Sequence, residues 1–195
     1  MAVTLRATKG SALTWDELDA NFNSLALLAG STSQTFSVAT ATSAAHAVRL
    51  DQLQTLPRFS AYSSTSPSIT SSVFAKLPAN TEEFDIGGMY DAATNYRFTP
   101  TVAGYYFFSA QAQFSAASGL TRVKTVLYKN GAIFKSGNDV APFSATQGDA
   151  NTSALIYMNG TTDYVEAYVL ATGTTPVLAG GAQNVSYFQG FLTGL

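Results

Sequence analysis

The stretch GYYFFSAQAQF, residues 104–114, contains the pattern that decides the fold. Successive side chains of a β-strand point to opposite faces of its sheet, so every second residue shares a face. One predicted face is continuously apolar and consists of Tyr106, Phe108, Ala110, Ala112 and Phe114. The other face starts with Tyr105 and Phe107 and then turns polar. The stretch therefore predicts a strand with one face in a core and one face that is only half apolar.

The last apolar phrase, SYFQGFL at 186–192, repeats this two-sided pattern. Phe188 and Leu192 fall on one predicted face, and Tyr187 and Phe191 fall on the other. An isolated sandwich would leave such aromatic side chains in water, whereas a second copy of the chain would cover them. We therefore expect an interface between copies that contains Tyr105, Phe107, Tyr187 and Phe191. The pattern itself does not select three copies over two.

Five phrases with aromatic residues and turn signals follow one another along the C-terminal two thirds of the chain. They are FSAY (59–62), YRFTPTVAGYYFFSA (96–110), LYKNG (127–131), DYVEAYV (163–169) and SYFQGFL (186–192). In this order and spacing they resemble the globular head of complement component one-q, the trimeric jelly roll shared with tumour necrosis factor. The resemblance implies a mainly β chain with an antiparallel jelly-roll β-sandwich head over residues 58–195, assembled as a homotrimer.

Composition excludes several kinds of partner. The chain has no cysteine, which rules out disulfides and thiolate metal sites and suits assembly in a reducing cytosol. Charged residues make up 11% and the net charge is -2, so no basic surface is expected for nucleic acid or an anionic membrane. Neither a secretory leader nor an apolar run of about 20 residues is present, so we expect no membrane insertion.

A short helix is predicted near the N-terminus, within a first region at residues 1–30. Thr14 and Glu17 have the spacing of a capping box, which starts the helix at Trp15. Apolar residues then recur three or four positions apart, at Trp15, Leu18, Phe22, Leu25 and Ala29, before Gly30. A helix of this length is marginal alone in water, so we expect it to pack on a partner.

The surrounding phrase, ATKGSALTWDELDANFNSL at 7–25, resembles the short N-terminal module of tail fibres and baseplate proteins of tailed bacteriophages. In that family the module sits at the virion-proximal end. The resemblance implies attachment to phage tail or baseplate proteins through Trp15, Leu18, Phe22 and Leu25. A well-capped amphipathic helix without this role remains the alternative.

Residues 31–57 are predicted to be a linker and a helical neck. Ser31 to Ala45 is rich in Ser, Thr and Ala and cannot bury enough surface to fold alone. AHAVRLDQLQTL at 45–56 has helical spacing and ends at Pro57. It contains His46, the only histidine, and three copies around an axis could present three imidazoles to a metal. A solvated or capping histidine is the simpler reading, and we predict no metal site.

A jelly roll of eight antiparallel strands places alternate connections at the end far from the neck. The predicted distal loops are roughly 63–80, 115–121, 137–150 and 172–183. The third of these is the most varied in composition, so we assign receptor binding to it, although plain soluble connections remain the alternative. The candidate receptor-binding residues are Asn138, Asp139, Phe143, Gln147 and Asp149.

The resemblance to complement heads also implies calcium near the apex. Calcium takes six to eight oxygen ligands, and this loop offers only the carboxylates of Asp139 and Asp149. An apical calcium is therefore possible but unassigned, and we predict no other cofactor.

We do not expect an enzyme. The single histidine lies in the neck and cysteine is absent, so the head has no base for a hydrolase of the serine or cysteine kind. A glycoside hydrolase needs two carboxylates across a cleft, whereas Asp163 and Glu166 are predicted to be solvated or turn residues. A polysaccharide depolymerase would be expected to show internal repeats, and the sequence has none.

The combined expectation is a phage tail fibre or receptor-binding protein, assembled in the host cytoplasm and located in the virion. Its head would bind a bacterial surface glycan or an outer-surface protein. Two alternatives remain: a structural virion component, such as a baseplate protein or fibre cap, and an enzyme that degrades surface polysaccharide.

Overall fold

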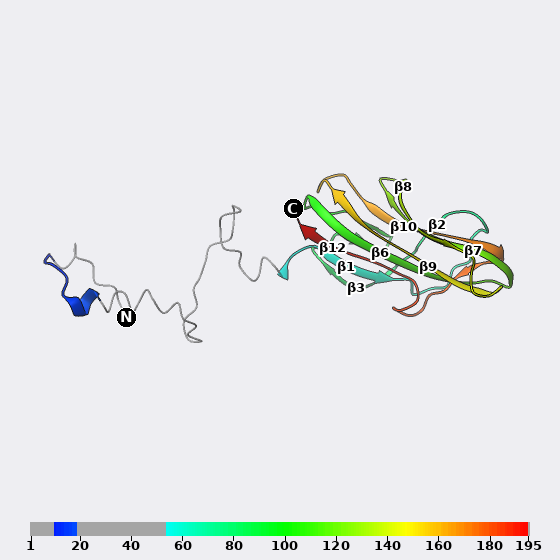
Figure 1. The fold of residues 1–195 in the computed structure, drawn as a ribbon, viewed down its shortest axis with the longest axis horizontal. Helices are drawn as coiled ribbons and strands as arrows, with labels where there is room; N and C mark the ends of the chain where they lie inside the picture. The colour runs from blue at the N-terminus through cyan, green and yellow to red at the C-terminus, as the bar shows by residue number, and fades with distance from the viewer. Residues whose placement is uncertain (1–9, 19–53, 195) are drawn as a thin grey trace. The chain divides into compact units, whose positions relative to one another are not determined.

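The structure is a computed structural model that describes residues 10–18 and 54–194, two parts that we treat separately (Figure 1). In the first part, residues 15–18 are helical. The backbone N of Thr14 donates to Glu17 Oε2 at 2.8 Å, and the backbone N of Glu17 donates to Thr14 Oγ1 at 3.2 Å. The predicted capping box and helix start are confirmed. Trp15 is 82% exposed.

Several predictions fall outside the described residues. Among them are the attachment residues Phe22 and Leu25, His46, and the linker. Of the predicted neck helix, only residues 54–56 are described.

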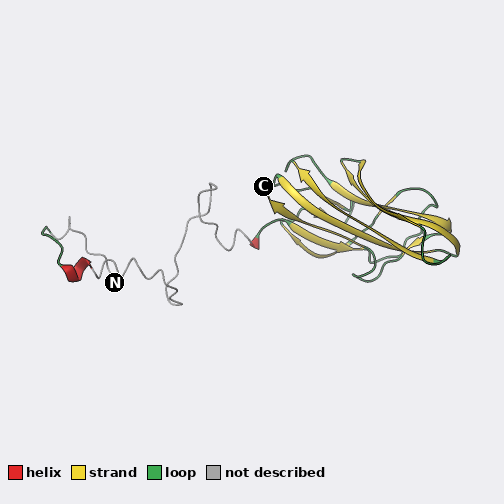
Figure 2. Ribbon diagram, viewed as in Figure 1, coloured by secondary structure: helices red, strands yellow, loops and turns green. Residues whose placement is uncertain are grey.

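The second part, the head, is built almost entirely of antiparallel strands (Figure 2). Its eight strands of five or more residues are β1 (Arg58–Tyr62), β3 (Thr81–Ile86), β6 (Gly104–Ser115), β7 (Ser118–Lys129), β8 (Ala132–Val140), β9 (Gln147–Met158), β10 (Val165–Thr174) and β12 (Tyr187–Gly194). The two-residue strands are β2 (Ala75–Lys76), β4 (Tyr90–Asp91), β5 (Arg97–Phe98) and β11 (Val177–Leu178). The predicted mainly β, antiparallel sandwich is confirmed.

The strands form two sheets. Sheet A has the order β9-β6-β12-β1-β3, with β11 beside the end of β6. Sheet B has the order β8-β7-β10-β5-β4, with β2 also paired to β10. The hairpin between β7 and β8 turns at Asn130 and Gly131, both at positive φ of 53° and 80°, as the KNG signal predicts.

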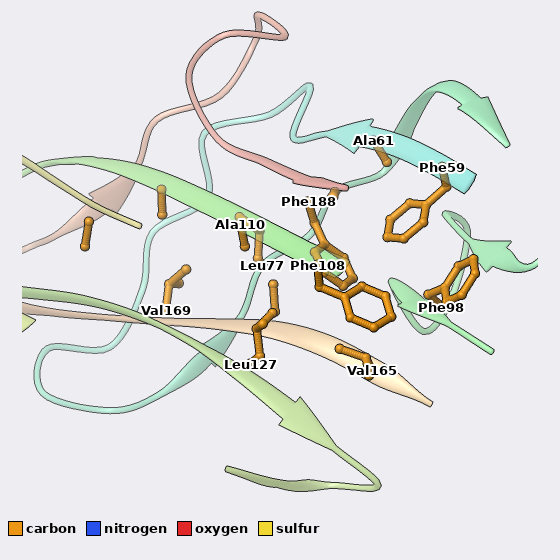
Figure 3. Packing of buried hydrophobic residues seen from close by; sticks show 14 of the residues in the cluster. Phe59, Ala61, Leu77, Phe98, Phe108, Ala110, Leu127, Val165, Val169 and Phe188 are labelled. Carbon is orange, nitrogen blue, oxygen red and sulfur yellow. The ribbon is translucent and has the colours of Figure 1, made fainter. Parts of the chain in front are cut away.

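The core lies between the sheets and is rich in aromatic rings. All five predicted core residues of β6 are fully buried. Phe59 of β1 stacks on Tyr90 at 4.6 Å. Its ring also stacks on Phe98 at 4.8 Å and meets Phe188 edge-on at 4.9 Å (Figure 3). Phe188 and Leu192 are buried on the predicted face of β12. The alternation in β6 and β12 therefore places one face of sheet A against the core.

The head has two distinct ends. At the entry end, Arg58 begins β1, and Gly194 of β12 lies opposite Tyr105. The alternate connections lie at the opposite, distal end, as predicted. Neighbouring distal connections are joined by backbone bonds: Ala116 N donates to Thr146 O at 2.9 Å, and Leu178 N donates to Pro67 O at 3.0 Å.

Two distal loops are shorter than predicted. The predicted loop 115–121 shrinks to residues 116–117, because β6 and β7 extend into it. The predicted loop 137–150 shrinks to 141–146, because β8 continues to Val140 and β9 begins at Gln147. Both segments are polar enough to resemble loops. Polar residues fit β8 because it is an edge strand. At the start of β9 the residues that face the core are small, Gly148 and Ala150.

Two carboxylates that we expected to be solvated or turn residues are buried, although Asp163 does lie in the connection between β9 and β10. Glu166 is 4% exposed and pairs with Lys76 Nζ at 2.6 Å, and Asp163 is 8% exposed and pairs with Lys129 Nζ at 2.8 Å. Each lysine comes from a segment distant in sequence, so the pairing was not visible in the local pattern. Asp91 ends β4, and its carboxylate stabilises the turn that follows by accepting hydrogen bonds from the backbone of Ala93, Thr94 and Asn95.

Candidate interaction surface

The face of sheet A that points away from the core carries aligned apolar side chains. Cross-strand register places Leu155, Phe107 and Phe191 side by side on β9, β6 and β12. Arg58 and Ile86 continue this row on β1 and β3. Cross-strand neighbours on one face lie in direct contact range, so the row is a continuous surface.

A second aromatic pair flanks this row at the entry end. Tyr105 of β6 lies opposite Tyr157 of β9, with ring centroids 5.4 Å apart and an edge-on orientation. Phe107 and Phe191 likewise approach to 5.6 Å. Large apolar side chains on this face stay about half exposed: Phe84 45%, Tyr105 49%, Leu155 55%, Tyr157 49% and Phe191 48%. Clustered exposure of this kind marks interaction surfaces, whereas single exposed residues do not.

Towards the distal end the same face becomes polar. The next row contains Ser153, Ser109, Gln189, Ser60 and Phe84. The row after it contains Asn151, Gln111, Tyr187, Tyr62 and Thr81. Only Phe84 in these two rows is a large side chain without a polar atom. The outer face of sheet A therefore grades from apolar at the entry end to polar at the distal end.

A hollow opens in the apolar part of this face. It is lined by Arg58, Phe59, Phe84, Phe107, Gln189, Gly190 and Phe191. Three phenylalanines form its walls on the outer face, and Arg58 and Gln189 supply polar groups. Such a hollow can accept an apolar side chain. It offers no pair of carboxylates and no nucleophile with a base.

The four residues predicted for an interface between copies all lie on this outer face. Tyr105 and Phe191 are exposed, and Phe107 and Tyr187 are partly buried by their neighbours. Their role in assembly stays a prediction. Phe84, Leu155 and Tyr157 also lie on this face but were not predicted to. For the last two a signal existed, because Ser153, Leu155 and Tyr157 alternate with Ala154, Ile156 and Met158, as in a strand.

The predicted receptor-binding residues lie on three elements of the head, and their role in binding stays a prediction. Asn138 and Asp139 lie on β8 of sheet B, and Gln147 and Asp149 lie on β9 of sheet A. Only Phe143 lies in the distal loop 141–146, where it is 72% exposed. Ser144 Oγ stabilises this loop by accepting from the backbone N of Gln147 at 2.8 Å.

Asp139 is fully engaged within the head. Its carboxylate receives two hydrogen bonds from the Arg122 guanidinium, both at 2.7 Å, and one from Lys124 Nζ at 3.2 Å. The Arg122 guanidinium and then Lys124 hold the pKa of Asp139 well below its usual range. A carboxylate with these partners is poorly suited to calcium.

Across residues 10–18 and 54–194, we find no group of three or more acidic, histidine or cysteine side chains arranged to hold a metal ion. In the same residues, no helix has the length and apolar character needed to cross a membrane.

Comparison with known proteins gives a likeness in fold. No protein-family model and no curated protein match the chain. The crystal structure of murine APRIL at pH 5.0 is similar with a TM-score of 0.54 and 9% identity, covering 70% of this chain and 98% of that chain. The structure of murine APRIL at pH 8.0 gives a TM-score of 0.52 and 8% identity over the same shares.

Eiger TNF from S. frugiperda is also similar, with a TM-score of 0.47, 10% identity, and coverage of 71% of this chain and 91% of that chain. At such low identity the APRIL structures establish the fold alone. The head is a jelly roll of the tumour-necrosis-factor type.

Proposed function

We propose that this chain is a bacteriophage tail fibre or receptor-binding protein that works as a homotrimer. Its N-terminal segment attaches to phage tail or baseplate proteins. The distal end of its head binds a glycan or a protein on the bacterial surface. The mechanism is adhesion without catalysis, and the protein is located in the virion after assembly in the host cytoplasm.

The half-exposed aromatic side chains on the outer face of sheet A carry the assembly part of the proposal. Five large side chains at the entry end and the middle of that face are about half in contact with water. Covering them with another copy removes apolar area at roughly 25 cal/mol per Å². The resemblance to trimeric jelly-roll heads favours three copies.

The phage part rests on the resemblance of residues 7–25 to tail-fibre modules. Its central capping box, Thr14 with Glu17, forms the reciprocal hydrogen bonds that start a helix. Trp15 and Leu18, two of the proposed attachment residues, lie in that helix, and Trp15 is accessible to a partner.

We assign adhesion to the distal end because it lies opposite the entry end, where the N-terminal segment joins the head. Phe143 projects there from a loop stabilised by Ser144. Polar side chains such as Asn138 and Gln147 lie on the strands that flank this loop. Three such ends on one rigid body would bind a repetitive surface together, so weak single contacts would become strong through effective concentration.

Binding of the full chain to cells tests the adhesion proposal. The purified chain, labelled with a fluorophore, should bind cells of the host of the phage that encodes it and should slow adsorption of that phage. Phe143→Ser should weaken binding, whereas Thr161→Ala, an exposed residue of the connection 159–164 at the entry end, should not. Binding to virion parts but not to cells would instead indicate a structural component. Release of reducing ends from host polysaccharide would indicate an enzyme.

A further inference from the structure

The four distal connections of the head contain no charged residue. They span residues 63–74, 116–117, 141–146 and 175–186, the last of which includes β11. Ser, Thr, Ala and Gly make up most of these residues. A ligand of the distal end would therefore meet hydroxyl, amide and backbone groups and small apolar surfaces.

Backbone hydrogen bonds join the four connections into one surface. Ala117 N donates to Thr174 O at 3.0 Å, and Gly181 N donates to Ser63 O at 2.9 Å. Together with the bonds already described between neighbouring connections, these contacts leave no connection isolated. A surface of this kind suits an extended ligand that touches several connections.

Phe143 supplies a flat apolar group on this surface. It is the most exposed large apolar side chain of the head, at 72%. Pro142 packs against Gly148 of β9, where a Cβ would clash with it, and Ser144 Oγ accepts from the backbone N of Thr146 at 3.2 Å. These contacts hold the backbone around Phe143 before any ligand binds. Because the face of an aromatic ring is electron-rich, Phe143 can stack on the C–H groups of a sugar ring.

Two hydroxyl groups on the first connection are positioned in advance. Ser66 Oγ accepts a hydrogen bond from Gly180 N at 3.0 Å, and Ser71 Oγ accepts one from Gly173 N at 3.2 Å. Both serines are exposed, and within the part of the chain that the structure describes neither oxygen donates. A serine hydroxyl keeps one hydrogen to donate when its oxygen accepts. Each can therefore donate to a ligand without first having to be ordered.

An anionic ligand is disfavoured here. Arg122 and Lys124, on the distal half of β7, both bind the carboxylate of Asp139. Asp149, near the start of β9, is exposed, and no ion pair among residues 10–18 and 54–194 uses it. Phosphate or carboxylate groups on a ligand would thus meet an unpaired carboxylate, while both of these cations are already neutralised.

The composition also disfavours a protein ligand. Interfaces between proteins are enriched in Tyr, Trp, Met and Arg and depleted in Ser and Ala. The four distal connections contain none of the first group and many of the second. Such a surface better suits a ligand that itself carries many hydroxyl groups.

We propose that the distal end binds an uncharged glycan, a chain of neutral sugars that stacks a C–H face on Phe143 and accepts hydrogen bonds from Ser66 and Ser71. This inference rests on the proposed function and gives the chemical class of the receptor. Contacts of this kind are weak singly, so binding depends on the three distal ends of one trimer acting together.

Competition with host polysaccharide tests the class of ligand. Surface polysaccharide of the host is separated by anion exchange into an unretained neutral fraction and a retained anionic fraction. The neutral fraction should displace the fluorescent full chain from host cells far better than the anionic fraction at equal sugar concentration. Digestion of the cells with proteinase K should leave binding unchanged. Equal or better displacement by the anionic fraction, displacement by neither fraction, or loss of binding after digestion would overturn the inference.

Substitutions of Phe143 test the stacking contact. Phe143→Ala should weaken binding of the neutral fraction about tenfold, whereas Phe143→Tyr, which keeps the ring, should change it by less than about twofold. Phe143→Leu keeps an apolar side chain without a ring and should behave like the alanine variant. Light scattering should give the same mass for all three. Wild-type affinity in the leucine variant would overturn the stacking contact.

Reversing the charge of Asp149 distinguishes the two kinds of glycan. Asp149→Lys should change binding to host cells by less than about twofold between about 50 mM and about 500 mM NaCl, because no charge of the ligand is in contact with it. Binding that becomes clearly tighter in this variant at low salt would show an anionic receptor and would overturn the inference.

Binding of the wild-type chain to host cells separates this inference from the proposed function. If the chain does not bind the cells, the proposed adhesion fails and the inference fails with it. If the chain binds the cells but the neutral fraction does not compete, only the class of receptor is wrong.

Discussion

The outer faces of the two sheets differ in how many of their side chains contact other residues of the same chain. On sheet B, five charged residues pair within the head: Lys76 with Glu166, and Arg122 and Lys124 with Asp139. Tyr128 and Tyr168 stack on each other at 4.0 Å. On sheet A, the large side chains near the entry end are aromatic or aliphatic and remain about half exposed.

This difference indicates which face is complete in a single copy. None of the exposed large apolar side chains of the described residues lies on β7 or β10, the central strands of sheet B. Ion pairs and stacked rings cover that face without a partner. The outer face of sheet A has apolar surface but few internal contacts to cover it, so it gains most from association.

The largest expected effect follows from placing charge on the face of sheet A. Tyr105→Lys combined with Phe107→Lys should reduce the trimer to monomers, with a loss of affinity of about 100-fold or more, because buried unpaired charges are costly. Strand content in circular dichroism should stay unchanged, since both side chains point away from the core. Light scattering that shows an unchanged mass would contradict the assignment of this face.

A matched substitution outside this face is Val73→Lys, which changes a residue that is 51% exposed in the connection 63–74. The mass of this variant should equal that of the wild type. Dissociation of this variant as well would show that association does not depend on the face of sheet A.

Breaking the buried pair on sheet B should affect folding and not assembly. Glu166→Ala leaves Lys76 with the Asn95 carbonyl oxygen, 3.0 Å away, as its remaining partner. We expect the free energy of unfolding to fall by about 2 kcal/mol, below the range for fully buried pairs because Lys76 is partly exposed. Urea unfolding in the Tyr105→Lys, Phe107→Lys background removes any contribution from association. A change in the mass of the otherwise wild-type trimer would contradict this separation.

A smaller effect is expected from Asp163 at low pH. A hydrogen bond from Asn130 and then Lys129 hold the pKa of Asp163 below its usual value. Its carboxylate therefore stabilises the head above about pH 4, and this stabilisation is lost as the pH falls through the lowered pKa. In the same monomeric background, unfolding free energy should drop between pH 5 and pH 2 by about 1 kcal/mol more than in the variant Asp163→Asn. Equal drops would contradict the assignment to Asp163.

The smallest effect is expected for the exposed cluster around Asp139. Asp139→Asn should leave the midpoint of urea unfolding unchanged within error, because ion pairs in contact with water contribute little. It should also leave host binding unchanged, since the carboxylate is already engaged with Arg122 and Lys124. Loss of binding to host cells in this variant would restore Asp139 as a receptor contact.

The parts of the fold that the sequence predicted are those with clear alternation. In β6, Tyr105 and Tyr106 are adjacent and chemically identical, yet period two correctly placed the first outside and the second inside. The reciprocal spacing of Thr14 and Glu17 predicted the helix start in the same way. Strong local patterns of this kind are the main sequence signal for secondary structure.

The missed features depend on contacts between distant segments. β9 begins with small and polar residues, so its start was predicted too late, and Leu155 and Tyr157 were not identified as part of the exposed face. Glu166 looked solvated because Lys76, its partner, lies 90 positions away. The candidate receptor residues were chosen from one loop in sequence, but strands β8 and β9 carry four of the five to two different sheets.

The head begins at Arg58 and finishes at Gly194, and both residues lie at the entry end. The loop 141–146 lies at the distal end. Substitutions or insertions in that loop therefore need not disturb the rows of Tyr105 and Phe107. Under the proposed function, the tip could be exchanged for one with another host preference while the contact between copies stays the same.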